Sequence, residues 1–113
     1  MKNNLKSSGL SHKVIKKIQQ VFARHSNIDL VRLYGSRAKG NHRQGSDIDL
    51  TVMGDGLSSS QLLKIETALD DLLLPYKIDI SLFRQIKTTD LIDHIQRVGI
   101  DFYRRPKPPR END

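Results

Sequence analysis

An acidic pair in an alternating run is the first pattern in this sequence that could carry chemistry. Asp47 and Asp49 alternate with apolar residues, as in a β-strand, so both carboxylates are expected on one face, with their Cα atoms about 6.6 Å apart. Two like charges at this spacing favour a divalent cation, and Mg²⁺ suits them because it binds few carboxylates together with substrate phosphates. A solvated sheet edge is the alternative interpretation of the pair.

A glycine-serine turn lies ten residues before this pair. Gly35-Ser36 follows a short apolar segment and is expected to open a helical turn whose backbone N–H groups favour an anion. The Ser36 hydroxyl group adds a donor for a phosphate oxygen, and positive charge follows at Arg37, Lys39 and Arg43. An ordinary turn with exposed basic side chains is the alternative, but the turn and the acidic pair together indicate a metal-bound nucleoside triphosphate.

A third aspartate lies in a later alternating run. Asp79 falls on the face opposite Ile78 and Ile80, so it shares a surface with Asp47 and Asp49 if their strands are neighbours. In a two-metal site with ions about 3.5–4 Å apart, one ion activates the attacking hydroxyl group and the other binds the triphosphate and leaving pyrophosphate. Asp79 would ligate the first ion and accept the proton of the nucleophile. His42, in the loop between the motifs, could be a ligand or base but is interpreted as a loop residue, and the other three histidines have no partner at a recognisable spacing.

Short apolar runs predict the sheet that must position these aspartates. They predict strands over 29–34, 47–53 and 77–83, with a short edge segment over 100–103. With the helices described next, the pattern predicts the α/β (α+β) class: a small mixed β-sheet of three to four strands, flanked by about four helices.

Helical spacing predicts three helices besides the short turn after Gly35. Their N-cap candidates are Ser11, a serine within 58–60, and Thr88 or the threonine that follows it. The second helix is expected to continue to about Leu73, and Gly99 is placed just past the end of the third.

Length and composition indicate one domain that occupies most of the chain. The 113 residues suit a single core, which we place at residues 11–103. Residues 1–10 are polar and are expected to form a flexible N-terminus, and residues 104–113 a disordered, basic, proline-rich tail. The absence of cysteine excludes disulfides and zinc-thiolate sites.

Charge and hydropathy limit the partners. A net charge of +6 could indicate a nucleic-acid-binding module, but it also suits a polyphosphate ligand or an acidic protein surface, and we do not expect direct nucleic-acid binding. The sequence has no run of 18 apolar residues and no apolar stretch typical of a secretory signal at its start. A soluble cytoplasmic protein without membrane association is therefore expected.

The order and spacing of these motifs resemble those of a known superfamily. Gly35-Ser36, then Asp47-Ile48-Asp49 and a separate Asp79, look like the nucleotidyltransferase superfamily of DNA polymerase β. Within it, the chain is especially similar to the minimal nucleotidyltransferases of bacteria and archaea. The resemblance implies the nucleotidyltransferase fold.

The same resemblance implies roles for the individual residues. Gly35 and Ser36 would hold the β- and γ-phosphates of ATP, the substrate. Asp47 and Asp49 would bind two Mg²⁺ ions, while Asp79 would bind the catalytic ion and act as base. The three basic residues of the turn and loop are additional candidates for stabilising negative charge.

A partner protein is also implied by the resemblance. We expect this chain to lack the helical domain that holds the acceptor in larger nucleotidyltransferases. Minimal nucleotidyltransferases are often paired with a small helical HEPN toxin, a ribonuclease that they neutralise by transferring AMP to a tyrosine. The resemblance implies that this chain is such an antitoxin. The alternative is a non-catalytic antitoxin that masks its partner by contact and retains the nucleotide site for regulation.

Overall fold

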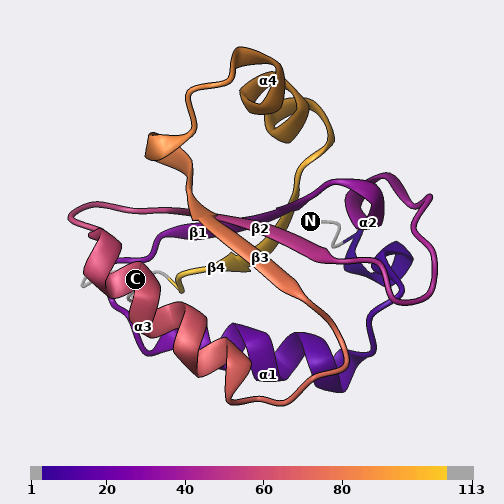
Figure 1. Ribbon diagram of the computed structural model, residues 1–113, viewed down its shortest axis with the longest axis horizontal. Helices are drawn as coiled ribbons and strands as arrows, with labels where there is room; N and C mark the ends of the chain where they lie inside the picture. The colour runs from indigo at the N-terminus through magenta and orange to yellow at the C-terminus, as the bar shows by residue number, and fades with distance from the viewer. Residues whose placement is uncertain (1–3, 107–113) are drawn as a thin grey trace, which may run out of the picture.

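A four-stranded sheet between helices forms the centre of the computed structural model, which describes residues 4–106 (Figure 1). Its elements in chain order are η1 (Asn4–Ser8), α1 (His12–Ala23), β1 (Leu30–Tyr34), α2 (Ser36–Lys39), β2 (Ile48–Met53), α3 (Ser59–Asp70), β3 (Ile78–Leu82), η2 (Phe83–Gln85), α4 (Thr89–Val98) and β4 (Ile100–Arg104).

The sheet is mixed, with the strand order β3-β2-β1-β4. Strand β1 pairs antiparallel with both β2 and β4, whereas β2 and β3 run parallel. The long connection through α3 allows the parallel pairing, because parallel neighbours need a crossover. The predicted fold class is confirmed, and the expected edge segment is the full edge strand β4.

Helices α1 and α3 cover one face of the sheet (Figure 1). Helix α1 begins after Ser11, whose side chain accepts a hydrogen bond from the Val14 N–H group, as an N-cap should. Each fully buried aliphatic or aromatic side chain in this layer contributes about 1.5–3 kcal/mol. The main core residues between these helices and the sheet are Ile18, Val21, Phe22, Val31, Leu33, Ile48, Leu50, Val52, Ile65, Leu69 and Leu82.

Helix α4 lies on the opposite side of the sheet, against β1 (Figure 1). Its residue Ile95 is fully buried there. Gly99 follows the helix as predicted, but its φ of −61° is not left-handed. The glycine is needed for space instead, since a β-carbon would lie 2.2 Å from the Ile95 carbonyl oxygen.

The N-terminal segment corrects one expectation. We expected residues 1–10 to be flexible, yet Leu5 and Leu10 are buried in the main core. The Ser8 hydroxyl group donates to the Leu5 carbonyl oxygen at 2.5 Å and accepts from the Leu10 N–H group at 3.2 Å. Two buried leucines and the hydrogen bonds of Ser8 therefore anchor this polar segment, while residues 1–3 lie outside the described part.

Two further boundaries differ from the sequence predictions. Helix α3 ends at Asp70 rather than near Leu73, which has a positive φ of 54° and therefore cannot continue the helix. The predicted tail begins inside β4, and Arg105 still bonds to Asp29 through its backbone and its guanidinium group. Residues 107–113 of the predicted tail lie outside the described part. Within residues 4–106, no helix combines the length and apolar character needed to cross a bilayer.

Candidate functional site

The turn between β1 and α2 forms the first half of the site. Gly35 is the N-cap of α2, with φ 76° and ψ −156°, a backbone conformation that is essentially restricted to glycine. The Asp49 carboxylate lies against it, so that a β-carbon at Gly35 would be 2.4 Å from the Asp49 Oδ2 atom. The predicted phosphate turn and the predicted acidic pair are therefore in direct contact.

The parallel pairing of β2 and β3 supplies the second half. Asp49 and Asp79 are register partners on these neighbouring strands, with their side chains on the face away from the main core. Neighbouring strands lie about 4.8 Å apart, which brings the two carboxylates together. Asp47 is exposed and directly precedes β2. The structure thus places all three predicted aspartates at the same end of the two strands.

The electrostatics of Asp49 favour a cation. Burial raises the pKa of the Asp49 carboxyl group, and the negative charges of Asp79 and Asp47 raise it further. His94 and Lys77 act in the opposite direction, with smaller effects. A bound cation would relieve both the desolvation and the repulsion.

The three aspartates do not enclose a metal ion by themselves. Within residues 4–106, no group of three or more histidine, cysteine or acidic side chains is arranged to hold one. Mg²⁺ needs fewer protein ligands than such a group provides, since it commonly binds one or two carboxylates and takes its other ligands from substrate phosphates and water. Asp49 and Asp79 fit that kind of site, next to a turn whose N–H groups suit phosphate.

Arg37 points into the protein rather than toward the surface of the turn. Its side chain is buried, and its Nε and Nη2 atoms donate to the Ser46 carbonyl oxygen at 3.1 and 2.9 Å. Its Nη1 atom donates to the Ser8 carbonyl oxygen at 2.8 Å, and the guanidinium group lies 5.0 Å from the centre of the Tyr76 ring. Arg37 therefore ties α2 to η1 and to the residue before Asp47.

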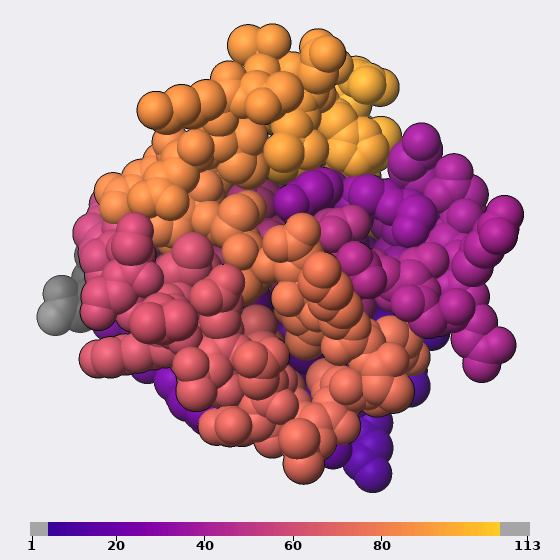
Figure 2. Space-filling model, viewed as in Figure 1, coloured from indigo at the N-terminus to yellow at the C-terminus, as the bar shows by residue number. Residues whose placement is uncertain are grey.

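Exposed positive charge remains near the turn at two predicted positions. Lys39 and Arg43 both have exposed side chains, and Ser36 is partly exposed at the start of α2. Figure 2 shows the purple and magenta segment that includes α2 beside the orange segment of β3, below the orange-to-yellow segment of α4. The turn and the acidic strands thus reach one face of the molecule.

His94 is a site residue that the sequence analysis missed. Its Nε2 atom accepts a hydrogen bond from the Gly35 N–H group at 3.1 Å. The signal that could have found it is its helical spacing, because His94 lies three residues after Leu91 and four before Val98, on the face that turns inward.

Tyr34 packs beside these groups. Its ring meets the His94 ring edge-on, with centroids 6.2 Å apart. Burial is the main cause that raises the pKa of the Tyr34 hydroxyl group, and Asp49 and Asp79 also raise it, while a hydrogen bond with Ser81 opposes them. The uncharged Tyr34 side chain therefore lines the site.

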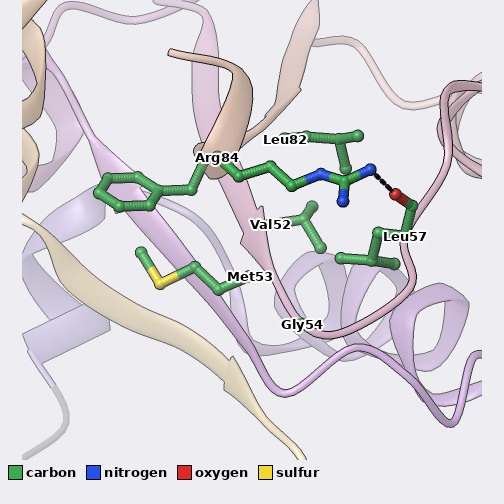
Figure 3. Close-up of a pocket in the computed structure, with 7 residues that line it drawn as sticks. Val52, Met53, Gly54, Leu57, Leu82 and Arg84 are labelled. Carbon is green, nitrogen blue, oxygen red and sulfur yellow. Dashed lines mark hydrogen bonds between the residues drawn. The ribbon is translucent and has the colours of Figure 1, made fainter. Parts of the chain in front are cut away.

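A small apolar cavity lies at the other end of β2 and β3. There the Arg84 side chain extends across Val52 and Leu82 and donates to the Leu57 carbonyl oxygen (Figure 3). The volume is about 100 Å³, well below that of sites for drug-sized ligands. This cavity is separate from the acidic site. Its lining residues are Val52, Met53, Gly54, Leu57, Leu82, Phe83 and Arg84.

Comparisons with known proteins agree with this arrangement. The sequence model of the family described as "Polymerase beta, Nucleotidyltransferase" matches residues 16–108. A search of curated protein sequences gave no match.

Solved structures with the same fold share little sequence with this chain. A chain from a toxin-antitoxin complex with AMP-PNP is 22% identical with a TM-score of 0.63, over 82% of this chain and 73% of that one. A chain from a tri-AMPylated Shewanella oneidensis HEPN toxin in complex with MNT antitoxin is 19% identical with a TM-score of 0.61, over 82% and 71%. A candidate nucleotidyltransferase from Sulfolobus solfataricus is 20% identical with a TM-score of 0.55, over 98% and 96%.

Proposed function

Because the chain belongs to the polymerase β nucleotidyltransferase family, we propose that it transfers AMP from ATP to a hydroxyl group of a partner protein, with Mg²⁺ as cofactor. The observation that carries the proposal is the register of Asp49 with Asp79, next to the Gly35 turn. This arrangement combines paired carboxylates for a cation with N–H donors for phosphates, which is what a nucleoside triphosphate requires.

The residues around the turn receive binding roles in this proposal. Gly35 and Ser36 bind the β- and γ-phosphates, and the exposed Lys39 and Arg43 neutralise phosphate charge. Arg37 has a different role, since its buried side chain donates two hydrogen bonds to the Ser46 carbonyl oxygen and thereby positions the loop before β2. This role replaces the direct nucleotide contact that its place in the sequence indicates.

In this proposal the three aspartates bind the metal ions, and one of them accepts the proton of the attacking hydroxyl group. Asp47, Asp49 and Asp79 would hold two Mg²⁺ ions, which supply charge neutralisation at the phosphates when bound. The acceptor hydroxyl oxygen attacks the α-phosphorus, and the bond from that phosphorus to the bridging oxygen of the pyrophosphate breaks. Asp79, whose side chain is exposed, takes the proton of the hydroxyl group.

The acceptor in this proposal is a tyrosine of a HEPN-type toxin, and the chain acts as its antitoxin. The structural neighbours support this choice, because they include a HEPN toxin that is AMPylated in complex with an MNT antitoxin.

Transfer of label tests the proposal directly. The purified chain is incubated with Mg²⁺, ATP labelled at the α-phosphate and the protein encoded by the neighbouring gene. We expect label on a tyrosine of that protein with the wild type and none with Asp49→Asn or Asp79→Asn. The matched control is Asp55→Asn, which changes an exposed aspartate beyond the other end of β2.

Three outcomes contradict the proposal or a part of it. Absence of label with the wild type, for ATP and for the other three triphosphates, would exclude transferase activity with this partner. Equal labelling by the wild type and Asp79→Asn would exclude the assigned base. If the partner is neutralised and bound equally well by Asp49→Asn, the chain is an antitoxin that acts by contact alone.

A further inference from the structure

His94 extends from α4 to the turn that begins the site. Its Nε2 atom lies 3.1 Å from the Gly35 backbone nitrogen, although 59 positions separate the two residues in sequence. The His94 ring also contacts the Tyr34 ring edge-on. Ile95, the next residue of α4, is fully buried and holds the helix against the sheet. The imidazole group is therefore held in place by its neighbours.

The direction of this hydrogen bond defines the role of the Nε2 atom. A backbone N–H group can only donate, so the Nε2 atom of His94 accepts with its lone pair. The engaged lone pair is not available to remove a proton from a substrate. The contact therefore favours a role in holding the Gly35 backbone.

The Gly35 backbone needs such a contact. Glycine has more conformational freedom than any other residue, and this one lies where the sheet pairing stops. The pairing of β1 with β2 ends at Tyr34 and Asp49, and the pairing with β4 ends at Leu33 and Ile100. The Gly35 N–H group, which follows the last paired residue of β1, therefore donates to the His94 imidazole instead of to a neighbouring strand.

We propose that His94 is a positioning residue for triphosphate binding, which holds the Gly35 amide so that the following N–H groups of the turn face the phosphates. The inference rests on the proposed nucleotidyltransferase function and adds a residue from α4 to it. Without the His94 acceptor, the peptide plane between Tyr34 and Gly35 can rotate. The turn must then become ordered when the nucleotide binds, which lowers the affinity for the nucleotide.

Two substitutions distinguish the effect of the hydrogen-bond acceptor from that of the size of the side chain. His94→Leu introduces an apolar side chain of similar size without an acceptor, whereas His94→Gln can place an amide oxygen near the Nε2 position. By calorimetry with MgATP, we expect His94→Leu to weaken the affinity about three- to tenfold and His94→Gln to stay within about twofold of the wild type. In transfer assays the loss appears in KM for ATP rather than in kcat.

Amide hydrogen exchange gives a readout that does not depend on nucleotide. The Gly35 amide proton should exchange faster in His94→Leu than in the wild type and in His94→Gln. His12→Leu, which changes an exposed histidine of α1, should alter neither the exchange nor the affinity.

The outcomes distinguish this inference from the function on which it rests. Affinity in His94→Leu that equals or exceeds that of the wild type overturns the positioning role, and tighter binding would mean that His94 competes with phosphate. A loss that His94→Gln does not restore also overturns the role of the acceptor. If the wild type binds none of the four Mg-triphosphates, the proposed function fails and this inference fails with it.

Discussion

The Asp49 carboxylate lies directly against the α-carbon of Gly35, so close that a β-carbon there would be 2.4 Å from the Oδ2 atom. This contact joins the end of β1 to the start of β2. It places the group that would bind a cation beside the turn that would bind phosphates. A change on either side of the contact should therefore disturb the other.

Adding a methyl group at Gly35 tests this contact. Gly35→Ala should weaken MgATP binding about tenfold or more, because the methyl group displaces the Asp49 carboxylate and the backbone conformation is strained. Gly40→Ala is the matched control: it has a similar φ of 82°, but no atom lies within 4 Å of its added carbon. Calorimetry should show a change within about twofold for the control. Equal losses in both variants would contradict the role of the contact.

The charge of Asp49 should cost stability in the absence of a cation. Burial and two neighbouring carboxylates raise its pKa, so the ionised form is disfavoured in the folded protein. Asp49→Asn should raise the melting temperature in a chelator by roughly 2–4 °C while it abolishes transfer. Differential scanning fluorimetry measures the change, with Asp55→Asn as the control. An unchanged or lower melting temperature for Asp49→Asn would show that the repulsion is already relieved.

Removal of the Arg37 guanidinium group should lower the free energy of unfolding. Arg37→Met leaves the part-buried carbonyl oxygen of Ser46 and the buried one of Ser8 without the Arg37 donors, which should cost about 2–4 kcal/mol. Urea denaturation measures the free energy of unfolding, and Lys39→Met, at an exposed position, should change it by less than about 0.5 kcal/mol. Normal stability of Arg37→Met with weakened nucleotide binding would instead support direct contact with phosphate.

His25 should make the protein less stable in mild acid. Burial, with smaller effects of Arg24 and Lys64, lowers its pKa below the ordinary 6.5, so the unfolded chain takes up the proton first as the pH falls. The unfolded state then binds more protons, and the free energy of unfolding decreases as the pH falls from about 6.5 through the lowered value. The neutral ring is held by Gln61, whose Nε2 atom lies 3.0 Å from His25 Nδ1.

A comparison of variants isolates this effect. His25→Asn should show a smaller fall in melting temperature between pH 7.5 and pH 5.5 than the wild type, since it cannot take up the proton. His12→Asn, at the exposed first position of α1, should match the wild type. Equal falls in His25→Asn and the wild type would exclude the contribution of His25.

Most elements were predictable because their signals are local. The Ser11 and Ser58 caps and the alternation around Asp49 and Asp79 each depend on a few neighbouring positions, and the structure has the expected elements there. The end of α3 was less predictable, because an apolar run continues past Asp70 although the backbone turns at Leu73. The segment before α1 was misjudged because two isolated leucines carry no periodicity.

The sequence by itself determined the candidate chemistry: a glycine turn, an alternating acidic pair and a third aspartate on a polar strand face. Only the tertiary structure decided that Asp79 faces Asp49, that Arg37 turns inward, and that His94 reaches Gly35. The physical reason is that side-chain alternation is set within one strand, whereas strand order and contacts between distant segments depend on how the whole core packs. The motif thus predicted which groups could react, and the packing determined which of them meet.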